Sequence, residues 1–408
     1  MDHKASSRKN RGKPAPSVIS LYTGAGGLDL GLEAAGFETR VCVEFDRESV
    51  RTVRHNRPWP VIDRDIATIR SEEILEVGGL KRGEVDLVAG GPPCQPFSKS
   101  AYWSTGDTKR LADPRASTLG QFMRVVDETL PRVFLIENVY GLTYEGKDEG
   151  MRFLRDRLAE INRRHKVAYS WSPKVLNAAD FGVPQIRERV FIVGIRSGVM
   201  FQFPDTRFVA DVGDASAQGS LFEREPYRTA WDAIGDLDGL DHGDSLKVGG
   251  RWAGLLPSIP EGQNYLWHSE RGGGIPLFRW RSRYWSFLLK LAKRLPSWTI
   301  QAQPGSAIGP FHWRNRRLSA TEMCRLQTFP AEFEVPGGLT AVQRQLGNAV
   351  PSALTEILGR AIRAQALGLK IDGAVTDATL IPPRRACPEP EAIARVPTRY
   401  RKLLVRAA

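Results

Sequence analysis

The sequence predicts an α/β fold in which a largely parallel β-sheet is covered by helices and joined to a second, smaller domain. From residue 17 onward, short apolar runs alternate with helical patterns, as parallel strands with crossover helices require. This alternation stops after Phe203 and Pro204, where glycine, serine, proline and aromatic residues become frequent until about residue 317. A helical pattern returns after Pro351, and we expect this last helix to pack back on the first domain.

The first strand is expected at residues 18–22, and a glycine-rich turn with Gly24, Gly26 and Gly27 follows it. Leucine and alanine then recur at helical spacing until Gly36, a residue suited to end a helix. Four further apolar runs have the continuous hydrophobic character of strands buried on both faces: residues 41–45, 85–89, 133–136 and 190–195. The chain up to about residue 204 is therefore expected to form one sheet-based domain.

The second domain concentrates the positive charge of the chain. The formal net charge is +12, and residues 251–317 hold eleven Lys or Arg against only Glu261 and Glu270, a net of +9. Six of the ten tryptophans lie in the same stretch, and residues 279–285 read Arg-Trp-Arg-Ser-Arg-Tyr-Trp. Interleaved cations and aromatic rings favour a nucleic acid as partner, although a generally basic surface is the simpler alternative.

Composition disfavours several classes of protein. No apolar run approaches the roughly 20 residues that span a bilayer, and no apolar segment after the basic N-terminus resembles a signal peptide. The four cysteines are scattered without a C-x-x-C pair, and the six histidines are dispersed as well. We therefore expect a soluble protein of a reducing cytosol, with neither a disulfide framework nor a metal site.

A nucleoside-bearing cofactor is indicated at the first glycine-rich turn. Such a turn lets a ligand approach the backbone, and Glu44 at the end of the second strand is placed to accept hydrogen bonds from ribose hydroxyls. The dinucleotide pattern G-x-G-x-x-G fails, because Asp29 stands where its third glycine would be, so NAD is disfavoured. For this segment alone, a tight turn without a ligand is the alternative.

Cys94 follows the predicted strand at 85–89 and should lie at the edge of the sheet where open α/β folds bind ligands. Pro92 and Pro93 fix the backbone before the sulfur, which suits a nucleophile that must be held at one angle of attack. A lone cysteine is more often a small buried apolar residue, and this interpretation stays open from the residue alone.

Two further polar segments flank predicted strands. Glu137 ends the strand that begins at residue 133, and partial desolvation would let it act as an acid, whereas in solvent it would be an ordinary carboxylate. Residues 185–189 read Gln-Ile-Arg-Glu-Arg before the last strand. Alternation places Gln185, Arg187 and Arg189 on one side, where they could bind carbonyl or phosphate oxygens or face solvent on an edge strand.

Taken together, these segments resemble the cytosine carbon-5 DNA methyltransferase family over about residues 18–358. The motifs follow the family's order: residues 22–27, the Pro-Cys-Gln segment around Cys94, Glu137-Asn138-Val139, residues 185–189, 317–330 and 347–351. Tyr22 stands where the family usually has phenylalanine, and it should preserve the aromatic contact. With no regulatory domain expected before the first strand, the chain resembles the compact bacterial enzymes of restriction-modification systems.

This resemblance implies a sheet of the S-adenosylmethionine-dependent methyltransferase (Rossmann-like) type with a second, smaller target-recognition domain. Cys94 would add to carbon 6 of a cytosine flipped out of double-stranded DNA, Glu137 would hold and protonate ring nitrogen 3, and Arg189 would bind the carbonyl oxygen at position 2. The residues implied to surround S-adenosylmethionine are Tyr22, Thr23, Gly24, Ala25, Gly26, Gly27, Glu44, Asp65, Ile66, Pro93, Leu119, Asn348 and Ala349.

The resemblance and the composition together divide the chain into four parts. Residues 1–16 are expected to be a basic disordered tail. Residues 17–204 with 341–371 would form the catalytic, cofactor-binding domain, and residues 205–340 the target-recognition domain, where the basic, tryptophan-rich stretch lies. Residues 372–408, rich in proline and arginine, are expected to be a weakly ordered tail.

Double-stranded DNA is the implied partner, and such an enzyme would protect DNA from a cognate restriction endonuclease acting on the same site. We expect no membrane contact and a cytoplasmic location at the nucleoid. Residues 98–113 have the polar composition of a loop that could close over the flipped base. An RNA cytosine methyltransferase and a non-catalytic DNA-binding relative are the alternatives; the large recognition region favours DNA, and the retained Cys94, Glu137 and Arg189 favour catalysis.

Overall fold

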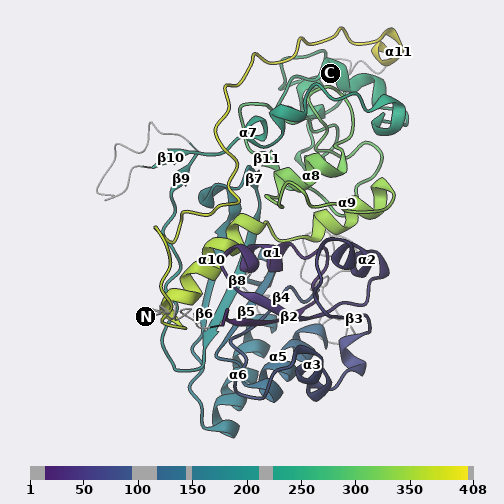
Figure 1. Ribbon diagram of the computed structural model, residues 1–408. Helices are drawn as coiled ribbons and strands as arrows, with labels where there is room; N and C mark the ends of the chain where they lie inside the picture. Colours follow the sequence, from purple (N-terminus) through teal and green to yellow (C-terminus); the bar gives the residue numbers. More distant parts are fainter. Residues whose placement is uncertain (1–13, 94–116, 144–148, 211–223, 403–408) are drawn as a thin grey trace, which may run out of the picture.

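A seven-stranded sheet forms the centre of the chain in the computed structural model, which describes residues 14–93, 117–143, 149–210 and 224–402 (Figure 1). The strand order is β3, β2, β1, β4, β5, β8, β6. In chain order the strands are β1 (Ser17–Leu21), β2 (Glu38–Val43), β3 (Val61–Ile62), β4 (Leu87–Gly90), β5 (Val133–Val139), β6 (Ser172–Asn177) and β8 (Glu188–Ile195). The first five in sheet order run parallel, and β8 is antiparallel to both of its neighbours. The expected largely parallel sheet is confirmed, with β8 as its reversed strand.

Helices cover both faces of the sheet, because its strands send successive apolar side chains to opposite sides. In β1, Ile19 and Leu21 belong to one apolar layer and Val18 to the other. The first layer includes residues of α3 (Ser71–Gly78), α5 (Ser117–Thr129) and α6 (Glu149–His165), and the second includes residues of α1 (Gly27–Ala34) and α10 (Ser352–Gln365) (Figure 1). Within the described ranges, no helix is both long and apolar enough to cross a membrane.

Helix α10 packs back on the sheet domain, as expected, and it touches α1 closely. A Cβ atom at Gly31 would lie 2.0 Å from Oγ1 of Thr355 and 2.2 Å from the carbonyl oxygen of Ser352. The Ser352 hydroxyl donates a hydrogen bond of 2.9 Å to the carbonyl of Gly27. The two helices therefore meet backbone to backbone, and only glycine fits at position 31.

Three strands, β1, β2 and β5, end at other residues than the sequence predicted. β1 ends at Leu21 because Tyr22 has a φ of 56°, in the left-handed region, which turns the chain out of the sheet. β2 ends at Val43, so Glu44 lies just beyond it. β5 continues to Val139 through its pairing with β8. The two outermost strands, β3 and β6, were not expected, because one has two residues and the other mixes polar and apolar residues.

The region beyond the sheet consists of short elements. Its helices are α7 (Ala230–Ile234), α8 (Ala320–Leu326) and α9 (Leu339–Asn348). One small parallel pair, β7 (Gln185–Ile186) with β11 (Ser297–Trp298), links it to the sheet domain. A second parallel pair, β9 (Phe208–Val209) with β10 (Glu225–Pro226), lies within the outer region. The remaining described helices are α2 (Arg47–Asn56), α11 (Thr398–Arg401) and the 3₁₀ turns η1 (Ile66–Thr68), η4 (Tyr140–Thr143), η5 (Ala178–Phe181), η7 (Gly235–Leu237), η8 (Gly243–Leu246), η9 (Ala253–Ser258), η10 (Tyr265–His268) and η11 (Ser282–Tyr284).

Two apolar cores hold this outer region. The inner core combines residues of α7, α8 and α9 with Ala25 and Leu30, which come from the glycine turn and α1. The outer core forms around Leu255, Leu288 and Phe311. The inner core therefore joins the region to the sheet domain, while the outer core is its own centre.

The C-terminal segment differs from the expected weak order. Residues 372–402 are described, and they run mostly without regular structure until α11. Their backbone and side chains are nevertheless bound to distant parts of the chain, and Val396 and Tyr400 are buried in the outer core. Composition alone predicts weak order here because it cannot reveal partners that are more than a hundred residues away.

Candidate functional site

Glu44 ties the glycine-rich turn to the end of β2. One carboxylate oxygen accepts a hydrogen bond of 2.7 Å from the N–H of Gly24, and the other accepts bonds of 2.9 and 2.8 Å from the N–H groups of Phe45 and Asp46. Burial raises the pKa of Glu44, and these backbone hydrogen bonds oppose that rise. The strand-end carboxylate of Glu44 is thus in direct contact with the glycine turn.

Free space and an exposed ring lie beside this carboxylate. A Cβ atom at Gly24 would have nothing within 4 Å, so the turn leaves its backbone accessible. The ring of Phe45 is 62% exposed, unusual for a large apolar side chain, and it offers a flat face to an aromatic base. Sequence reasoning missed Phe45; its position directly after Glu44 was the available signal.

The other expected cofactor residues gather around the same edge. Tyr22 donates a 2.8 Å hydrogen bond from its hydroxyl to the carbonyl of Thr118, whose own hydroxyl donates to the carbonyl of Pro93 at 2.8 Å. Buried Leu119 follows directly in α5. The carboxylate of Asp65 accepts a bond from the N–H of Ala67 and so caps the turn that starts at Ile66. These contacts fix the two loops next to the glycine turn.

The segment around Asn348 closes the remaining side. A Cβ atom at Gly27 would lie 2.3 Å from the carbonyl oxygen of Val350, so this segment abuts the glycine turn. Arg344 in α9 donates a 2.9 Å hydrogen bond to Asp46, which follows Glu44. Asn348 is exposed at the end of α9, and Ala349 is buried.

Glu137 and Arg189 form an ion pair at the ends of two neighbouring strands. Nε of Arg189 lies 3.1 Å from Oε1 of Glu137, and both side chains are largely buried. A Cβ atom at Gly91 would lie 2.9 Å from Oε2 of the same glutamate. Asn138 donates a 3.0 Å hydrogen bond to the carbonyl of Pro92. The segment that leads toward Cys94 is thus held over the end of β5, while Cys94 itself and the expected closing loop at 98–113 lie outside the described residues.

Burial strengthens proton binding at the Glu137 carboxyl. It raises the pKa of Glu137, and the positive charges of Arg189 and Arg187 oppose that rise. The alternative of an ordinary carboxylate in solvent is therefore wrong. A carboxyl that holds its proton more tightly than usual suits a general acid.

Gln185 and Arg187 do not reach a substrate surface. Both are fully buried, with exposures of 0% and 1%. The Arg187 guanidinium donates a 2.9 Å hydrogen bond to the carbonyl of Gly347, at the end of α9. Gln185, Arg187 and Arg189 were expected on one side, but only Arg189 forms an ion pair with the Glu137 carboxylate. Arg187 instead binds the backbone at Gly347.

The basic, aromatic stretch divides into a surface and a core. Trp280, Tyr284 and Trp285 are 40%, 52% and 44% exposed, and the Arg271 guanidinium lies 5.3 Å from the Trp280 ring centre. Trp313 is fully buried. Lys290 and Lys293 are buried as well, so the sequence count of cations overstates the positive surface of this region.

Comparison with known proteins gives a consistent assignment. The family model described as C-5 cytosine-specific DNA methylase matches residues 17–364. The Type II methyltransferase M.SacI of Streptomyces achromogenes is 42% identical over 372 residues, which cover 85% of this chain and 93% of that protein. M.NgoFVII of Neisseria gonorrhoeae, another Type II methyltransferase, is 31% identical over 350 residues, covering 85% and 86%.

Solved structures share the fold at low sequence identity. A putative DNA modification methyltransferase encoded within a prophage of E. coli superposes with a TM-score of 0.60 at 21% identity, covering 86% of this chain and 99% of that one. A mutant of DNMT2 from Spodoptera frugiperda gives a TM-score of 0.56 at 17% identity, covering 85% and 100%.

Proposed function

The chain belongs to the C-5 cytosine-specific DNA methylase family, and on that premise we propose how its own residues divide the work of the reaction. It is a DNA cytosine-5-methyltransferase of the restriction-modification type. Its reaction moves a methyl group from S-adenosylmethionine to carbon 5 of a cytosine. The proposal concerns the residues that hold the cofactor, activate the base and choose the DNA sequence.

The glycine-turn site fits S-adenosylmethionine. The Glu44 carboxylate suits the ribose hydroxyls, the open space at Gly24 admits close backbone approach, and the exposed ring of Phe45 suits the adenine ring. When bound there, S-adenosylmethionine supplies the methyl group. We assign the other cofactor contacts to Tyr22, Thr23, Ala25, Gly26, Gly27, Asp65, Ile66, Pro93, Leu119, Asn348 and Ala349.

Cys94, Glu137 and Arg189 are assigned to the base. The sulfur of Cys94, as its thiolate, forms a bond to carbon 6 of a cytosine flipped out of the duplex. Glu137 gives its proton to nitrogen 3, so electron density moves to carbon 5. Arg189 binds the carbonyl oxygen at position 2. After carbon 5 has received the methyl group, it loses its proton to a solvent base, the bond between carbon 6 and sulfur breaks, and the proton on nitrogen 3 returns to Glu137.

The observation that carries this assignment is the buried pair of Glu137 and Arg189 beside Gly91. The pair is 3.1 Å apart, and Gly91 lies three residues before Cys94 in the sequence. A buried acid and a fixed cation at this place provide the two contacts that an activated cytosine needs at nitrogen 3 and at its carbonyl oxygen.

Residues 205–340 are assigned to target recognition. The exposed Trp280, Tyr284 and Trp285 and the arginines between them support contacts with DNA bases and phosphates. We further propose that the methylation protects DNA from a cognate restriction endonuclease and that the protein works in the cytoplasm at the nucleoid, since DNA is its substrate.

The mechanism is tested by trapping the covalent adduct. DNA with 5-fluorocytosine at the target position cannot lose a proton from carbon 5, so the bond between sulfur and carbon 6 should persist. With S-adenosylmethionine present, the protein should give a complex that survives denaturing electrophoresis. The Cys94→Ala protein should give none, although it should still bind the DNA and lose that binding as salt increases.

Two controls make this test decisive. The same sequence as RNA should be neither trapped nor methylated; a trapped RNA would favour the RNA methyltransferase alternative. Methyl transfer to DNA by a folded Cys94→Ala protein would contradict the assignment of the nucleophile, and folding is checked by its unchanged affinity for S-adenosylmethionine.

A further inference from the structure

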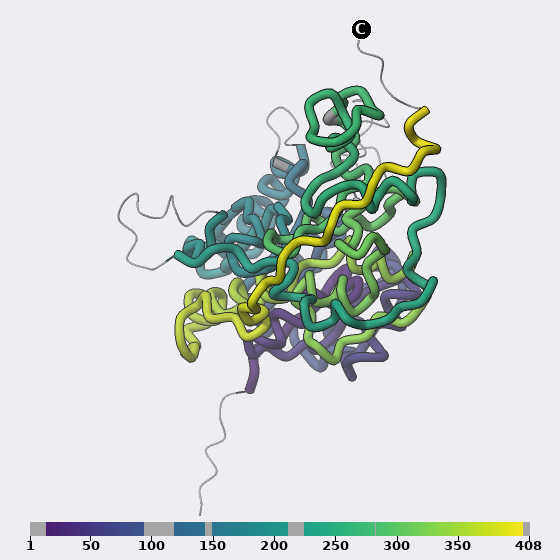
Figure 2. Tube along the Cα trace, turned by 90° about the horizontal axis from the view of Figure 1, so that it is seen from above, coloured from purple at the N-terminus to yellow at the C-terminus, as the bar shows by residue number. Residues whose placement is uncertain are grey.

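The segment after α10 crosses from the sheet domain to the outer core of the recognition region. We call residues 372–401 the C-terminal strap. Figure 2 shows it as the extended yellow tube that passes over the green recognition region. The strap lies beyond residues 17–364, which match the family model, and the proposed mechanism uses none of its residues. Its contacts therefore need a separate explanation.

Buried carboxylates hold the first half of the strap by its backbone. Glu356 in α10 accepts hydrogen bonds from the N–H groups of Thr379 at 2.7 Å and Leu380 at 3.0 Å. Asp232 in α7 accepts a bond of 2.8 Å from the N–H of Arg385. Glu356 and Asp232 are 0% and 2% exposed, so each carboxylate depends on the strap for part of its hydrogen bonding. The strap is thus tied to the sheet domain and then to the recognition region.

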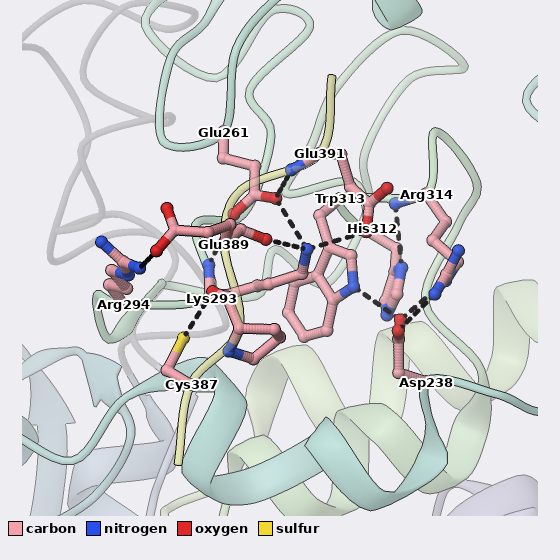
Figure 3. A network of polar contacts seen from close by, with 11 residues as sticks. Asp238, Glu261, Lys293, Arg294, His312, Trp313, Arg314, Cys387, Glu389 and Glu391 are labelled. Carbon is pink, nitrogen blue, oxygen red and sulfur yellow. Dashed lines mark hydrogen bonds and ion pairs between the residues drawn. The ribbon is translucent and has the colours of Figure 1, made fainter. Parts of the chain in front are cut away.

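A third carboxylate and a buried lysine hold the second half (Figure 3). Glu261 accepts a 2.8 Å hydrogen bond from the N–H of Glu391. The ammonium group of Lys293 lies 2.7 Å from the Glu391 carboxylate, 3.2 Å from that of Glu261 and 3.1 Å from the carbonyl of Glu389. The Lys293 side chain is 2% exposed, so its charge must be balanced by these partners. Arg294 adds an exposed ion pair with Glu389.

The end of the strap is an apolar anchor. Val396 and Tyr400 are buried in the outer core, and the Tyr400 ring is stacked on that of Trp252 with 6.1 Å between the ring centres. The Tyr400 hydroxyl donates a 2.8 Å hydrogen bond to the carbonyl of Arg251. The strap therefore ends inside the outer core of the recognition region. Leu277 and Leu288 of this core flank the exposed Trp280 and Tyr284 in the sequence.

We propose that the C-terminal strap is a positioning element for DNA recognition: it fixes the recognition region against the sheet domain and so sets the affinity for the DNA site. This proposal rests on the proposed recognition function of residues 205–340. A recognition surface held in its DNA-bound position loses less freedom on binding, and DNA therefore binds more tightly. The glycine turn and the Glu137 pair make none of the strap contacts described above, so cofactor binding and methyl transfer should not depend on the strap.

The test compares full-length variants. Glu391→Gln weakens the pairing with Lys293, and Val396→Asp with Tyr400→Ala removes the apolar anchor. Glu389→Gln is the matched control, because that side chain is 85% exposed and its ion pair should be weak. Release of the strap is measured as faster trypsin cleavage after Arg395, read by mass spectrometry. In both released variants KM for DNA should rise by about tenfold or more, while kcat changes by less than about threefold. The dissociation constant of S-adenosylmethionine should stay unchanged, and the control should match wild type.

Each other outcome overturns the proposal. A strap that is cut faster with no rise in KM for DNA would show that it does not position the recognition region. A strap that stays protected in both variants would show that these contacts do not hold it. Parallel losses of kcat, cofactor affinity and thermal stability would assign the strap to general folding. Failure of the mechanism itself is read separately, as the absence of a wild-type adduct with 5-fluorocytosine DNA.

Discussion

Burial decides the chemistry of single residues in this protein. Burial raises the pKa of Glu137 because the carboxyl has little contact with water, and Arg189, whose Nε lies 3.1 Å from its Oε1, limits that rise. Arg187 contributes a second positive charge, and its guanidinium donates a hydrogen bond to the carbonyl of Gly347. The proton affinity of the acid is therefore set by the balance of desolvation against two arginines.

This balance predicts the pH dependence of methylation. Because Glu137 must carry a proton, kcat/KM should fall as pH rises through its pKa. Arg189→Ala removes a cation that lowers this pKa, so the alkaline limb should move to higher pH, while the rate falls by about tenfold or more through loss of the carbonyl contact. Arg189→Lys keeps a charge and should leave the limb closer to wild type. An alkaline limb that stays in place or moves to lower pH in Arg189→Ala would contradict this account.

Helix α1 follows the glycine turn directly and carries a buried acid in its first turn. It begins at Gly27, after the N-cap residue Gly26 with a φ of 84°, and it carries Asp29, fully buried, in its first turn. Burial raises the pKa of Asp29 to about 7, and neither of its carboxyl oxygens has a hydrogen-bond partner among the described residues. The glycine turn is thus followed by a carboxyl that the folded protein prefers to keep neutral.

The position of Asp29 predicts how stability depends on pH. Its pKa is about 7 in the folded protein against an ordinary value of 3.8, so the folded state binds the proton more tightly than the unfolded chain. The stability from this group is present below about pH 4 and is lost as pH rises through 7. Asp29→Asn should therefore raise the free energy of unfolding at pH 8 by about 1–3 kcal/mol and change it little at pH 4. Urea unfolding at both pH values measures this.

A surface control separates burial from loss of an acid as such. Glu33→Gln changes another acid of the same helix, one whose side chain is 40% exposed and pairs with Arg57. It should shift the free energy of unfolding by less than about 1 kcal/mol at either pH. Equal gains at pH 4 and pH 8 in Asp29→Asn would rule out the charge of Asp29 as the cause.

In the whole molecule, the recognition region and the sheet domain share an apolar core. Ala25 and Leu30 enter the same core as α7, α8 and α9. The strand pair β7 with β11 adds a backbone connection, and the C-terminal strap adds another from outside. The surface that meets DNA and the edge that holds the reacting groups are therefore parts of one packed body.

Exchange of the recognition region should change the methylated sequence. Replacing residues 205–316 with the matching region of a relative that methylates another sequence should transfer that relative's specificity, because the exposed arginines and aromatic rings lie there. The exchange should retain acids at 232 and 261 and a lysine at 293, since these hold the strap. Bisulfite sequencing of DNA from cells that express the chimera provides the readout. An active chimera with the original methylation pattern would contradict the assignment.

The sequence by itself determined the sheet, the order of the motifs and the kind of chemistry. Strands that are buried on both faces need apolar runs, and the glycine turn with Glu44 and the strand-end Glu137 follow from positions within or next to those runs. These are local patterns, so they are readable without knowledge of distant contacts. The family resemblance implied that Glu137 and Arg189 bind the same base, and the structure places the two side chains in contact. Cys94 lies outside the described residues and stays a prediction.

Only the tertiary structure decided which polar residues belong to the interior. Lys293 and Trp313 were counted with the DNA-facing surface, yet both are buried, and Arg187 binds a carbonyl in a segment 160 residues away. The C-terminal strap was expected to be weakly ordered, yet Glu356, Asp232 and Glu261 bind its backbone. A charged side chain becomes a core residue only when a distant partner compensates its desolvation, and such a partner leaves no mark in the local sequence.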